Sequence, residues 1–535
     1  MAFFPGSSIR KSPLVQLFKR VVSEWASISG VSSVMLPEIP ESSQRVMPTM
    51  SEISSGPCTV ITGSEKILPG LVTNVPLVVS VIGSTGFAYQ NGLQRKLTTK
   101  GRCGLPRRIF SKGIWLTISE ADRDALHVVL ADESICIGPA PAAKSYLNMS
   151  AIVSAAVLTG CEAIHPGYGL LSENPKFAAL CKECGLGFIG PDAEIIEKMG
   201  DKDAARRTMR EAGVPIIPGC DVVEGVRQAQ AEAERIGFPL LIKARAGGGG
   251  RGIRRVNGPE EVEMAYLSAT AEAQSAFGDG AVYMEKFLFP VKHIEMQILC
   301  DNYGQVVCLG ERECSMQRKN QKTLEESPSP SMTEEMRREM IRVSTLAAKT
   351  VGYKGLGTIE FLLTQEHQFY FMEMNTRLQV EHPVTEMVTD VDLVKWQIRV
   401  AAGVKLDFTQ EDVRLSGHAI ECRINAEDPS MGFRPSCGKI TLLHIPGGPK
   451  VRFDTALYHD YVVPPFYDSM IGKLIVHAGT RQEAIRKMQA ALCEMVIEGV
   501  EHNRELQLET ISAPEFIDGS YTTDFLGKLL KELYP

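Results

Sequence analysis

Two strand-forming segments near the middle of the chain constrain its fold more than any other feature. Thr358–Leu363 is rich in β-branched and apolar residues, and Phe369–Phe371 is aromatic throughout. Residues 364–367 between them are polar, and we expect a turn there. The two segments therefore predict an antiparallel hairpin in which Leu363 pairs with Gln368.

The polar residues of this hairpin collect on one face. Residues two apart in a strand point to the same side, so Glu373 and Asn375 project together. The expected register places Glu360 diagonal to Glu373. Two carboxylates this close need a cation, and hard oxygen ligands suit Mg²⁺ bound to a nucleotide phosphate. The alternative is a hairpin whose charged face simply meets solvent.

Composition limits the class of protein. A chain of 535 residues holds several domains or one multi-lobed enzyme. The net charge of −7 excludes a basic nucleic-acid binder, and the longest apolar run, Val75–Ile82, is too short to span a bilayer. The 13 cysteines lack a metal-finger spacing, and we interpret the pair Cys181 and Cys184 as reduced structural thiols.

Residues 1–113 differ from the rest. Thirteen serines fall in the first 60 residues, and residues 1–112 hold 13 Lys and Arg against 5 Asp and Glu. This composition is typical of an organelle-targeting leader, a possible transit peptide. The alternative is an extension without fixed structure.

From Ile114 onward, strand and helix patterns alternate, which predicts a parallel sheet flanked by helices. Further along, residues 291–375 are typical of an antiparallel sheet with one long helix. The predicted strands are 114–118, 163–164, 188–189, 239–243 and 281–285, and the predicted helices are 150–159, 333–351 and 481–498.

A glycine run, residues 247–250, follows Lys243 at the end of an apolar strand. Free backbone N–H groups in such a run can wrap an anion and close as a lid, although a plain flexible loop also fits. Lys243 needs an anionic partner because its strand is apolar. Lys202 is a second candidate phosphate lysine or a surface lysine at a helix start. Residues 284–288 end a strand, where free backbone groups can pair with an adenine edge; the alternative is an ordinary strand exit.

Seven segments together resemble biotin carboxylase, the ATP-grasp subunit or domain of biotin-dependent carboxylases. They are residues 165–174, 199–202, 243–252, 311–322, 373–383, 421–428 and 467–473. The resemblance implies a multi-lobed α/β and α+β fold: an N-terminal parallel α/β domain, an ATP-grasp domain and a C-terminal β-rich domain. It divides the chain into a divergent region (1–113), a partial N-terminal domain (114–205), the ATP-grasp domain (206–402) and the C-terminal domain (403–535).

The resemblance also implies the activity. ATP and bicarbonate would carboxylate biotin on a biotin carboxyl carrier protein, the first half-reaction of acetyl-CoA carboxylase in fatty acid synthesis. Carboxyltransferase subunits and a second copy of the chain are the expected partners. Asn320 and residues 432–435 resemble the plastid and cyanobacterial type, so we expect the chloroplast stroma, or the cytoplasm if the chain is bacterial. Alternatives are a non-catalytic or defective splice or gene-model form, and another ATP-grasp ligase.

Four residues carry catalytic roles by resemblance. Arg377 and Lys322 would grip bicarbonate, since a guanidinium fork suits a planar anion. Glu381 would be the general base, because a carboxylate between cations stays ionised. Arg423 would stabilise the enolate-like oxygen of biotin.

The resemblance assigns a larger set to ligands. Two lysines would hold the ATP phosphates beneath the glycine lid, the strand exit would frame the adenine, and a histidine would contact the ribose. The implied ligand-binding residues are Lys202, Lys243, Gly249, Gly250, Glu285, Lys286, Leu288, His293, Gln317, Asn320, Val380 and Tyr168. The implied ligands of Mg²⁺ or Mn²⁺ are Glu360, Glu373 and Asn375.

The chain departs from the family at its start. The usual opening strand and its Ala-Asn-Arg-Gly-Glu-Ile-Ala motif are absent before Ile114. The run Pro76–Gly86 resembles a strand followed by glycine, but Gly101, Gly104 and Pro106 would break a helix that returns the chain. We therefore expect that this run does not replace the strand, which would leave unpaired strand edges.

Overall fold

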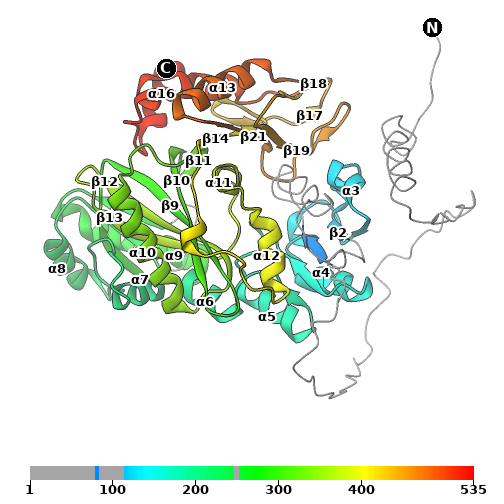
Figure 1. Cartoon of the computed structure of the whole chain (residues 1–535). Helices are drawn as coiled ribbons and strands as arrows, with labels where there is room; N and C mark the ends of the chain where they lie inside the picture. Colours follow the sequence, from blue (N-terminus) through cyan, green and yellow to red (C-terminus); the bar gives the residue numbers. More distant parts are fainter. Residues whose placement is uncertain (1–78, 83–113, 246–251) are drawn as a thin grey trace, which may run out of the picture. The chain divides into compact units, whose positions relative to one another are not determined.

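The computed structural model describes residues 79–82, 114–245 and 252–535 (Figure 1). These residues form three main sheets with helices packed against them, and the fold class predicted from the sequence is confirmed.

The first sheet is parallel, in the order β3-β2-β1-β4-β5. Its strands are β1 (Val79–Ile82), β2 (Ile114–Ile118), β3 (Glu133–Cys136), β4 (Ala163–His165) and β5 (Gly187–Phe188). The helices of this part are α3 (Leu126–Leu130), α4 (Met149–Leu158) and α5 (Pro175–Glu183), with the 3-10 turns η3 (Glu120–Asp122) and η4 (Ala142–Lys144). Buried side chains of α4 and α5, such as Ile152 and Phe177, pack on Ile164 of β4.

Strand β1 contradicts the sequence-based expectation that the opening strand is not replaced. It lies at the centre of the sheet and pairs in parallel with both β2 and β4. The expectation was based on the helix breakers at 101–106. These residues affect only a helix that would follow the strand, and they do not prevent the strand itself. Four residues rich in valine and isoleucine suffice to bridge two neighbours. The helix question falls on residues 83–113, outside the described ranges.

Two helices, α6 (Ala193–Gly200) and α7 (Lys202–Glu211), lead to the second sheet, β7-β6-β8, which is antiparallel. Its strands are β6 (Leu240–Ala244), β7 (Ile253–Val256) and β8 (Val282–Lys286), covered by α8 (Val226–Ile236) and α9 (Val262–Phe277), with η5 (Pro259–Glu261) between β7 and α9. The glycine run at 247–250 joins β6 to β7 and lies outside the described residues.

The third sheet has the order β13-β12-β9-β10-β11-β14-β21-β19. Its strands are β9 (Val291–Cys300), β10 (Val306–Arg318), β11 (Gln321–Ser327), β12 (Gly355–Thr364), β13 (Phe369–Asn375), β14 (His418–Asn425), β19 (Val451–Thr455) and β21 (Met470–Ala478). Strands β11 and β14 pair through Glu325 and Glu421. The sheet therefore continues without a break across residue 402, where the sequence predicted a domain boundary.

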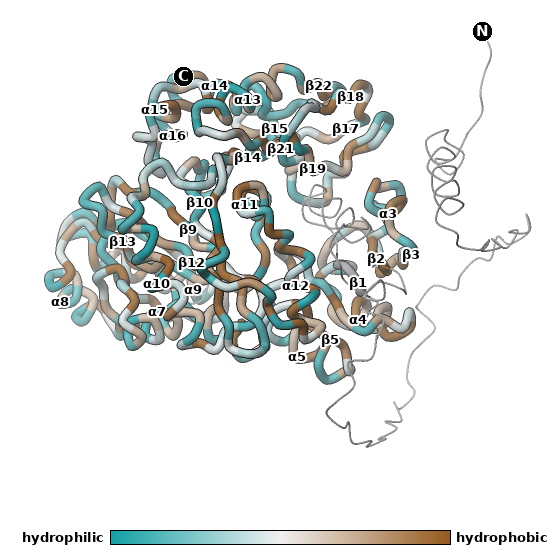
Figure 2. The backbone as a smooth tube through the Cα atoms, in the orientation of Figure 1, coloured by the Kyte–Doolittle hydropathy of each residue, from teal (hydrophilic) through white to brown (hydrophobic). Residues whose placement is uncertain are grey.

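Helices flank this sheet along its length. They are α10 (Glu334–Val351), α11 (His382–Thr389), α12 (Leu393–Ala401), α13 (Arg481–Glu494), α14 (Arg504–Ser512), α15 (Pro514–Asp518) and α16 (Phe525–Leu533). Short strands and turns complete it: β15 (Glu427–Asp428), β16 (Arg434–Pro435), β17 (Gly438–Lys439), β18 (Leu442–His444), β20 (Val462–Val463), β22 (Val496–Glu498), η6 (Gln410–Asp412) and η7 (Pro429–Met431). Hydrophobic residues, brown in Figure 2, recur along strands and helices and form the buried cores.

Two local predictions need correction. The helix expected over 481–498 ends at Glu494, and Val496–Glu498 forms β22, because Met495 is extended and the next two residues favour a strand. In the hairpin, Leu363 pairs with Phe369 and Glu360 lies directly opposite Glu373. A bulge between Glu360 and Phe361 shifts the register, which the sequence pattern did not reveal.

The remaining predicted elements are confirmed within a residue or two. Cys181 and Cys184 are free thiols, Cys181 buried on α5 and Cys184 exposed just after it. Within the described ranges, no helix has the length and apolar character needed to cross a membrane.

Candidate active site

Lys322 lies at the centre of a buried group of carboxylates. Its Nζ is 2.7 Å from Glu381 Oε1 and 3.0 Å from both Glu295 Oε1 and Glu360 Oε1. Burial alone would lower the pKa of this ammonium, but the three carboxylates hold the pKa well above its usual range. Lys322 is therefore a fixed positive charge in the site.

The β10–β11 hairpin places Lys322 there. Lys319 and Asn320 adopt positive φ angles of 50° and 64° in its turn, and Lys322 follows on β11. Asn320, expected near the nucleotide, is exposed at this turn. Gln317 precedes the turn, and its Nε2 lies 2.7 Å from His293 Nδ1.

The three predicted metal ligands converge at the ends of β12 and β13. Glu360 and Glu373 are opposite each other, and Asn375 Nδ2 donates to Glu360 Oε1 at 2.8 Å. Lys202 Nζ lies 3.6 Å from Glu373 Oε2. Two carboxylates and an amide oxygen form a hard donor set that fits Mg²⁺. Lys202 lies at the start of α7 and is a cation next to this donor set.

Glu360 is also tied to the site by cations. His293 Nε2 lies 2.9 Å from Glu360 Oε2. Burial would raise the pKa of Glu360, but Lys322 and His293 outweigh it and hold that pKa far below its usual range. Burial alone would lower the pKa of His293, and Glu360 raises it. The carboxylate stays ionised, and both of its oxygens already have partners within the site.

Glu381 lies at the N-terminus of α11 between two cations. Arg423 Nη2, from β14, is 3.0 Å from Glu381 Oε2, on the other side from Lys322. Burial would raise the pKa of Glu381, but Lys322 and then Arg423 lower it well below its usual value. Arg423 Nε also donates to Glu325 Oε1 at 2.7 Å. Glu381 is therefore an ionised hydrogen-bond acceptor held in a fixed place.

Sequence reasoning missed a buried support beneath these residues. Arg312 is fully buried and donates to Gln297 Oε1 and Gln379 Oε1, each at 2.6 Å, and to Glu295 Oε2 at 3.3 Å. Gln379 in turn donates to Glu360 Oε1 at 2.8 Å. The sequence carried no clear signal for this pair, since the strands of Glu295 and Arg312 also carry other charged residues, such as Lys292 and Glu313.

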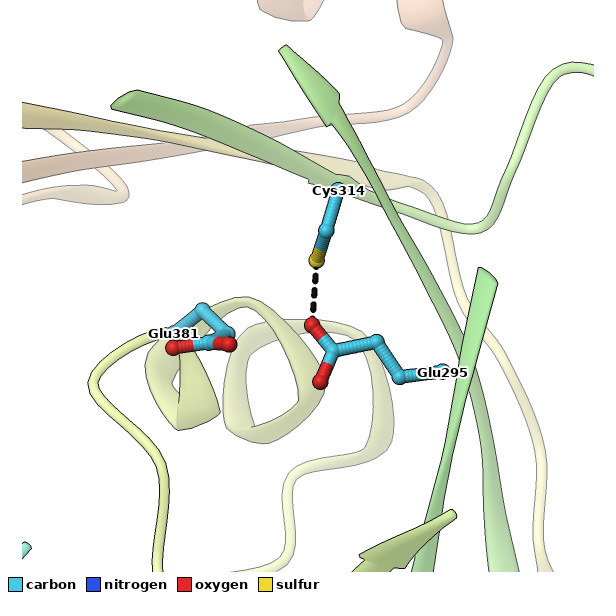
Figure 3. Close-up of side chains that lie close together, drawn as sticks. All are labelled: Glu295, Cys314 and Glu381. Atoms are coloured by element: carbon cyan, nitrogen blue, oxygen red, sulfur yellow. Dashed lines mark hydrogen bonds between the residues drawn. The ribbon is translucent and has the colours of Figure 1, made fainter. Parts of the chain in front are cut away.

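Figure 3 shows that Glu295, Cys314 and Glu381 lie close together. Cys314 donates its thiol proton to Glu295, and burial raises the pKa of this thiol well above its usual value. The Lys322 ammonium bonds both carboxylates, so their charge is already compensated. This triad is a hydrogen-bonded support of the site, and its chemistry does not call for a metal ion.

Lys243 and Glu285 meet across the second sheet. Lys243 Nζ is 2.5 Å from Glu285 Oε2, and Arg206 Nη1 is 3.0 Å from Glu285 Oε1. The anionic partner that Lys243 was expected to need is thus a carboxylate on β8. The two lid glycines, Gly249 and Gly250, lie outside the described residues.

The Lys286 side chain fixes the end of β8 through hydrogen bonds to the backbone before β6. Lys286 Nζ donates to the carbonyls of Phe238 at 2.7 Å and Gly237 at 3.2 Å. Lys286 and Leu288 line a cleft of about 340 Å³ together with Arg255. The cleft has an apolar edge, but the backbone N–H groups of Lys286 and Phe287 already donate to the carbonyls of Pro218 and Pro239, so at these two residues the backbone is not free as the sequence predicted.

Tyr168 and Val380 lie within one hydrophobic cluster. Tyr168 is buried and Val380 is partly buried against the same group. The Val380 carbonyl accepts a 2.7 Å hydrogen bond from Lys473 Nζ on β21. The structure therefore brings most of the described predicted residues to the carboxylate site and the second sheet, places Tyr168 and Val380 in a hydrophobic cluster, and leaves Asn320 at the surface.

Comparison with known proteins identifies the fold. Three family profiles match: "Biotin carboxylase, N-terminal domain" over residues 111–196, "Carbamoyl-phosphate synthase L chain, ATP binding domain" over 201–409, and "Biotin carboxylase C-terminal domain" over 421–528. Biotin carboxylase 1 of Bacillus subtilis is 53% identical over 410 residues, 76% of this chain and 91% of that protein. The chain belongs to the biotin carboxylase family. The resemblance seen in the sequence is thus confirmed.

Plant and structural relatives agree with this family. The chloroplastic biotin carboxylase of Arabidopsis thaliana is 52% identical over 416 residues, 78% of each chain. A biotin carboxylase structure from Campylobacter jejuni has a TM-score of 0.79 at 45% identity and covers 84% of this chain and 98% of that one. The dimeric biotin carboxylase domain of Hydrogenobacter thermophilus 2-oxoglutarate carboxylase, solved with MgADP, ADP and bicarbonate, has a TM-score of 0.78 at 44% identity, with coverages of 84% and 97%.

The profile match places the unusual part of this biotin carboxylase. The N-terminal profile begins at residue 111, so β1 at Val79–Ile82 lies outside it. The central strand of the first sheet is therefore supplied by a segment that the family profile does not match.

Proposed function

We propose that this biotin carboxylase uses ATP and bicarbonate to carboxylate N1 of biotin on a carrier protein. An oxygen of bicarbonate attacks the γ-phosphorus of ATP, the bond to ADP breaks, and the bicarbonate proton passes to Glu381. Carboxyphosphate then breaks into carbon dioxide and phosphate, the phosphate takes the N1 proton of biotin, and the deprotonated N1 attacks the carbon dioxide. The single observation that carries this proposal is the ionised Glu381 carboxylate held between Lys322 and Arg423.

Each side chain has a role that its geometry supports. Lys322 and Arg377 flank the carboxylate site and suit a bicarbonate anion. Arg423 presents a guanidinium beside Glu381, where it can stabilise the oxygen of deprotonated biotin. Lys202 and Lys243 would neutralise ATP phosphates. Glu360, Glu373 and Asn375 would hold Mg²⁺, which supplies charge neutralisation for the phosphates; Mn²⁺ fits the same donors.

The predicted partners and location form the finer part of the proposal. We infer a separate carrier protein, separate carboxyltransferase subunits and acetyl-CoA as the eventual acceptor. The serine-rich, basic composition of residues 1–113 and the chloroplastic relatives support the plastid stroma. Fluorescence of the full chain fused at its C-terminus to a reporter, viewed in leaf cells, tests this location.

The alternative, a non-catalytic form with an incomplete fold, has lost its main support. It rested on a missing strand, and β1 fills that place. ADP release from MgATP and bicarbonate, with and without free biotin, tests the activity. We expect biotin to stimulate ADP release by the wild-type protein and not by a folded Arg423→Ala variant. A wild-type protein without this stimulation would contradict the proposal.

A further inference from the structure

Glu173 joins the first sheet domain to the segment that carries Arg377. Its Oε2 accepts a hydrogen bond from Arg377 Nε at 2.8 Å, and its Oε1 accepts one from the Thr376 backbone N–H at 2.9 Å. One carboxylate therefore fixes both the side chain of Arg377 and the main chain beside it. Arg377 is separated from Glu173 by more than 200 residues of sequence.

The position of Glu173 is itself well defined. Ser172 Oγ accepts from the Gly169 N–H at 2.8 Å, and Asn174 caps α5 by accepting from the Phe177 N–H at 2.9 Å. Glu173 lies between these two bonded residues, at the start of the helix. The carboxylate is thus mounted on a short segment that has little freedom to move.

The contact determines which way the Arg377 guanidinium faces. While Nε is bound to Glu173, Nη2 donates to Asn375 Oδ1 at 3.0 Å, beside the predicted metal ligands. The guanidinium is therefore hydrogen-bonded both to the first sheet domain and to the end of β13. A bicarbonate bound by Arg377 would meet a preset fork rather than a mobile side chain.

We propose that Glu173 is a positioning residue for bicarbonate, acting through Arg377. This inference rests on the proposed function, because it takes Arg377 as the bicarbonate ligand. Glu173 touches neither ATP nor biotin in this role. Its loss weakens bicarbonate use while ATP use stays normal.

A merely structural tie between domains would behave differently. The Glu173 side chain is 39% exposed, and exposed ion pairs contribute little to stability. A second exposed pair, Lys354 Nζ to Asp192 Oδ2 at 3.1 Å, links the same two parts of the chain away from the site. Asp192→Asn is therefore a matched control, because it removes a comparable ion pair without touching Arg377.

The test measures ADP release by the full chain with free biotin, varying bicarbonate at saturating MgATP and then the reverse. For Glu173→Gln we expect the KM for bicarbonate to rise about tenfold, because one charge-assisted hydrogen bond is lost. The KM for ATP should stay within about twofold of the wild-type value. Asp192→Asn should leave both values unchanged. Glu173→Asp, which keeps the charge on a shorter arm, should fall between wild type and Glu173→Gln.

Four outcomes would overturn the proposal. An unchanged KM for bicarbonate in Glu173→Gln would contradict the positioning role of Glu173 and leave the proposed function standing. An equal rise of this KM in Asp192→Asn would do the same. A wild-type protein without biotin-stimulated ADP release would remove the proposed function and this role with it. Thermal unfolding of each variant shows that it is folded, and if Glu173→Gln is not, an unchanged bicarbonate KM in Glu173→Asp contradicts the role.

Discussion

Arg423 Nη2 lies 3.0 Å from Glu381 Oε2, although the two residues come from β14 and the start of α11. The contact exists because β14 continues the sheet of β9 to β13 through its pairing with β11. A residue of the C-terminal strands, Arg423, therefore contacts Glu381, the proposed general base, which belongs to the ATP-grasp part. The proposed chemistry depends on this continuity.

Lys322→Gln should reduce ADP release at least about 100-fold, because three buried carboxylates would lose the ammonium that compensates them. The variant should also be less stable. Lys292→Gln is a suitable control, since Lys292 is a similarly covered lysine near Glu313 on another part of the sheet. Activity of Lys322→Gln within about tenfold of wild type would contradict the central place given to this residue.

The acid sensitivity of Lys322→Gln follows from the depressed pKa of Glu381. The pKa of Glu381 is lower in the folded chain than in the unfolded chain, where it is about 4.3. The ionised carboxylate therefore stabilises the fold above about pH 4.3, and this stabilisation is lost as the pH falls through the pKa of the folded state. Without Lys322 the pKa of Glu381 rises. Any residual activity should therefore fall off on the acid side at a higher pH than in wild type, and superimposable acid limbs would exclude this coupling.

Glu421→Gln should stabilise the protein above neutral pH. Both Glu421 carboxyl oxygens are buried without a hydrogen-bond partner among the described residues, and burial raises the pKa of Glu421 to about 8. Because the folded pKa lies above the unfolded value, wild-type stability falls as pH rises from about 4.5 towards 8. Thermal unfolding should show a higher midpoint for the variant at pH 8.5 and a much smaller gain at pH 5. A lower midpoint at pH 8.5 would show that the carboxylate is needed there.

The two carboxylates of the proposed metal site should respond differently to mutation. Glu373→Gln should raise the Mg²⁺ concentration for half-maximal ADP release about tenfold, through loss of one ligand charge. Glu360→Gln should be more severe, because Glu360 also pairs with Lys322 and His293. Titration of Mg²⁺ at fixed ATP measures both. Equal effects of the two variants would indicate that the surrounding ion pairs of Glu360 do not matter.

Truncation tests the strand that the family profile does not match. Removal of residues 1–72 leaves β1 intact and should preserve solubility and ADP release. Removal of residues 1–82 deletes β1, so β2 and β4 lose their shared neighbour, and we expect insoluble or much less stable protein. Similar thermal midpoints for the two truncations would show that β1 is dispensable.

The sequence predicted the carboxylate site well because strand periodicity and a few charged residues define it. Glu373 and Asn375 share a face by alternation alone, and the structure brings Glu360 to them. The predicted register was wrong by one residue at Leu363, and a bulge between Glu360 and Phe361 shifts it further. A bulge depends on packing between strands and not on the two segments themselves.

Other features depended on partners distant in sequence. Arg312 and Glu295 support the site through contacts across three strands, so local patterns named neither. Strand β1 was rejected because the residues after it break helices, whereas its pairing is set by β2 and β4. Tertiary pairing overrode a local reading in both cases.

The most direct measurement is biotin-stimulated ADP release by wild type and by Glu381→Gln at saturating MgATP and bicarbonate. Gln keeps the shape of the side chain and still accepts hydrogen bonds, but it cannot take a proton. We expect a folded variant whose stimulated rate is at least about 100-fold lower, as for loss of a general base. A folded Glu381→Gln protein with a wild-type stimulated rate would contradict the assignment of Glu381 as the base.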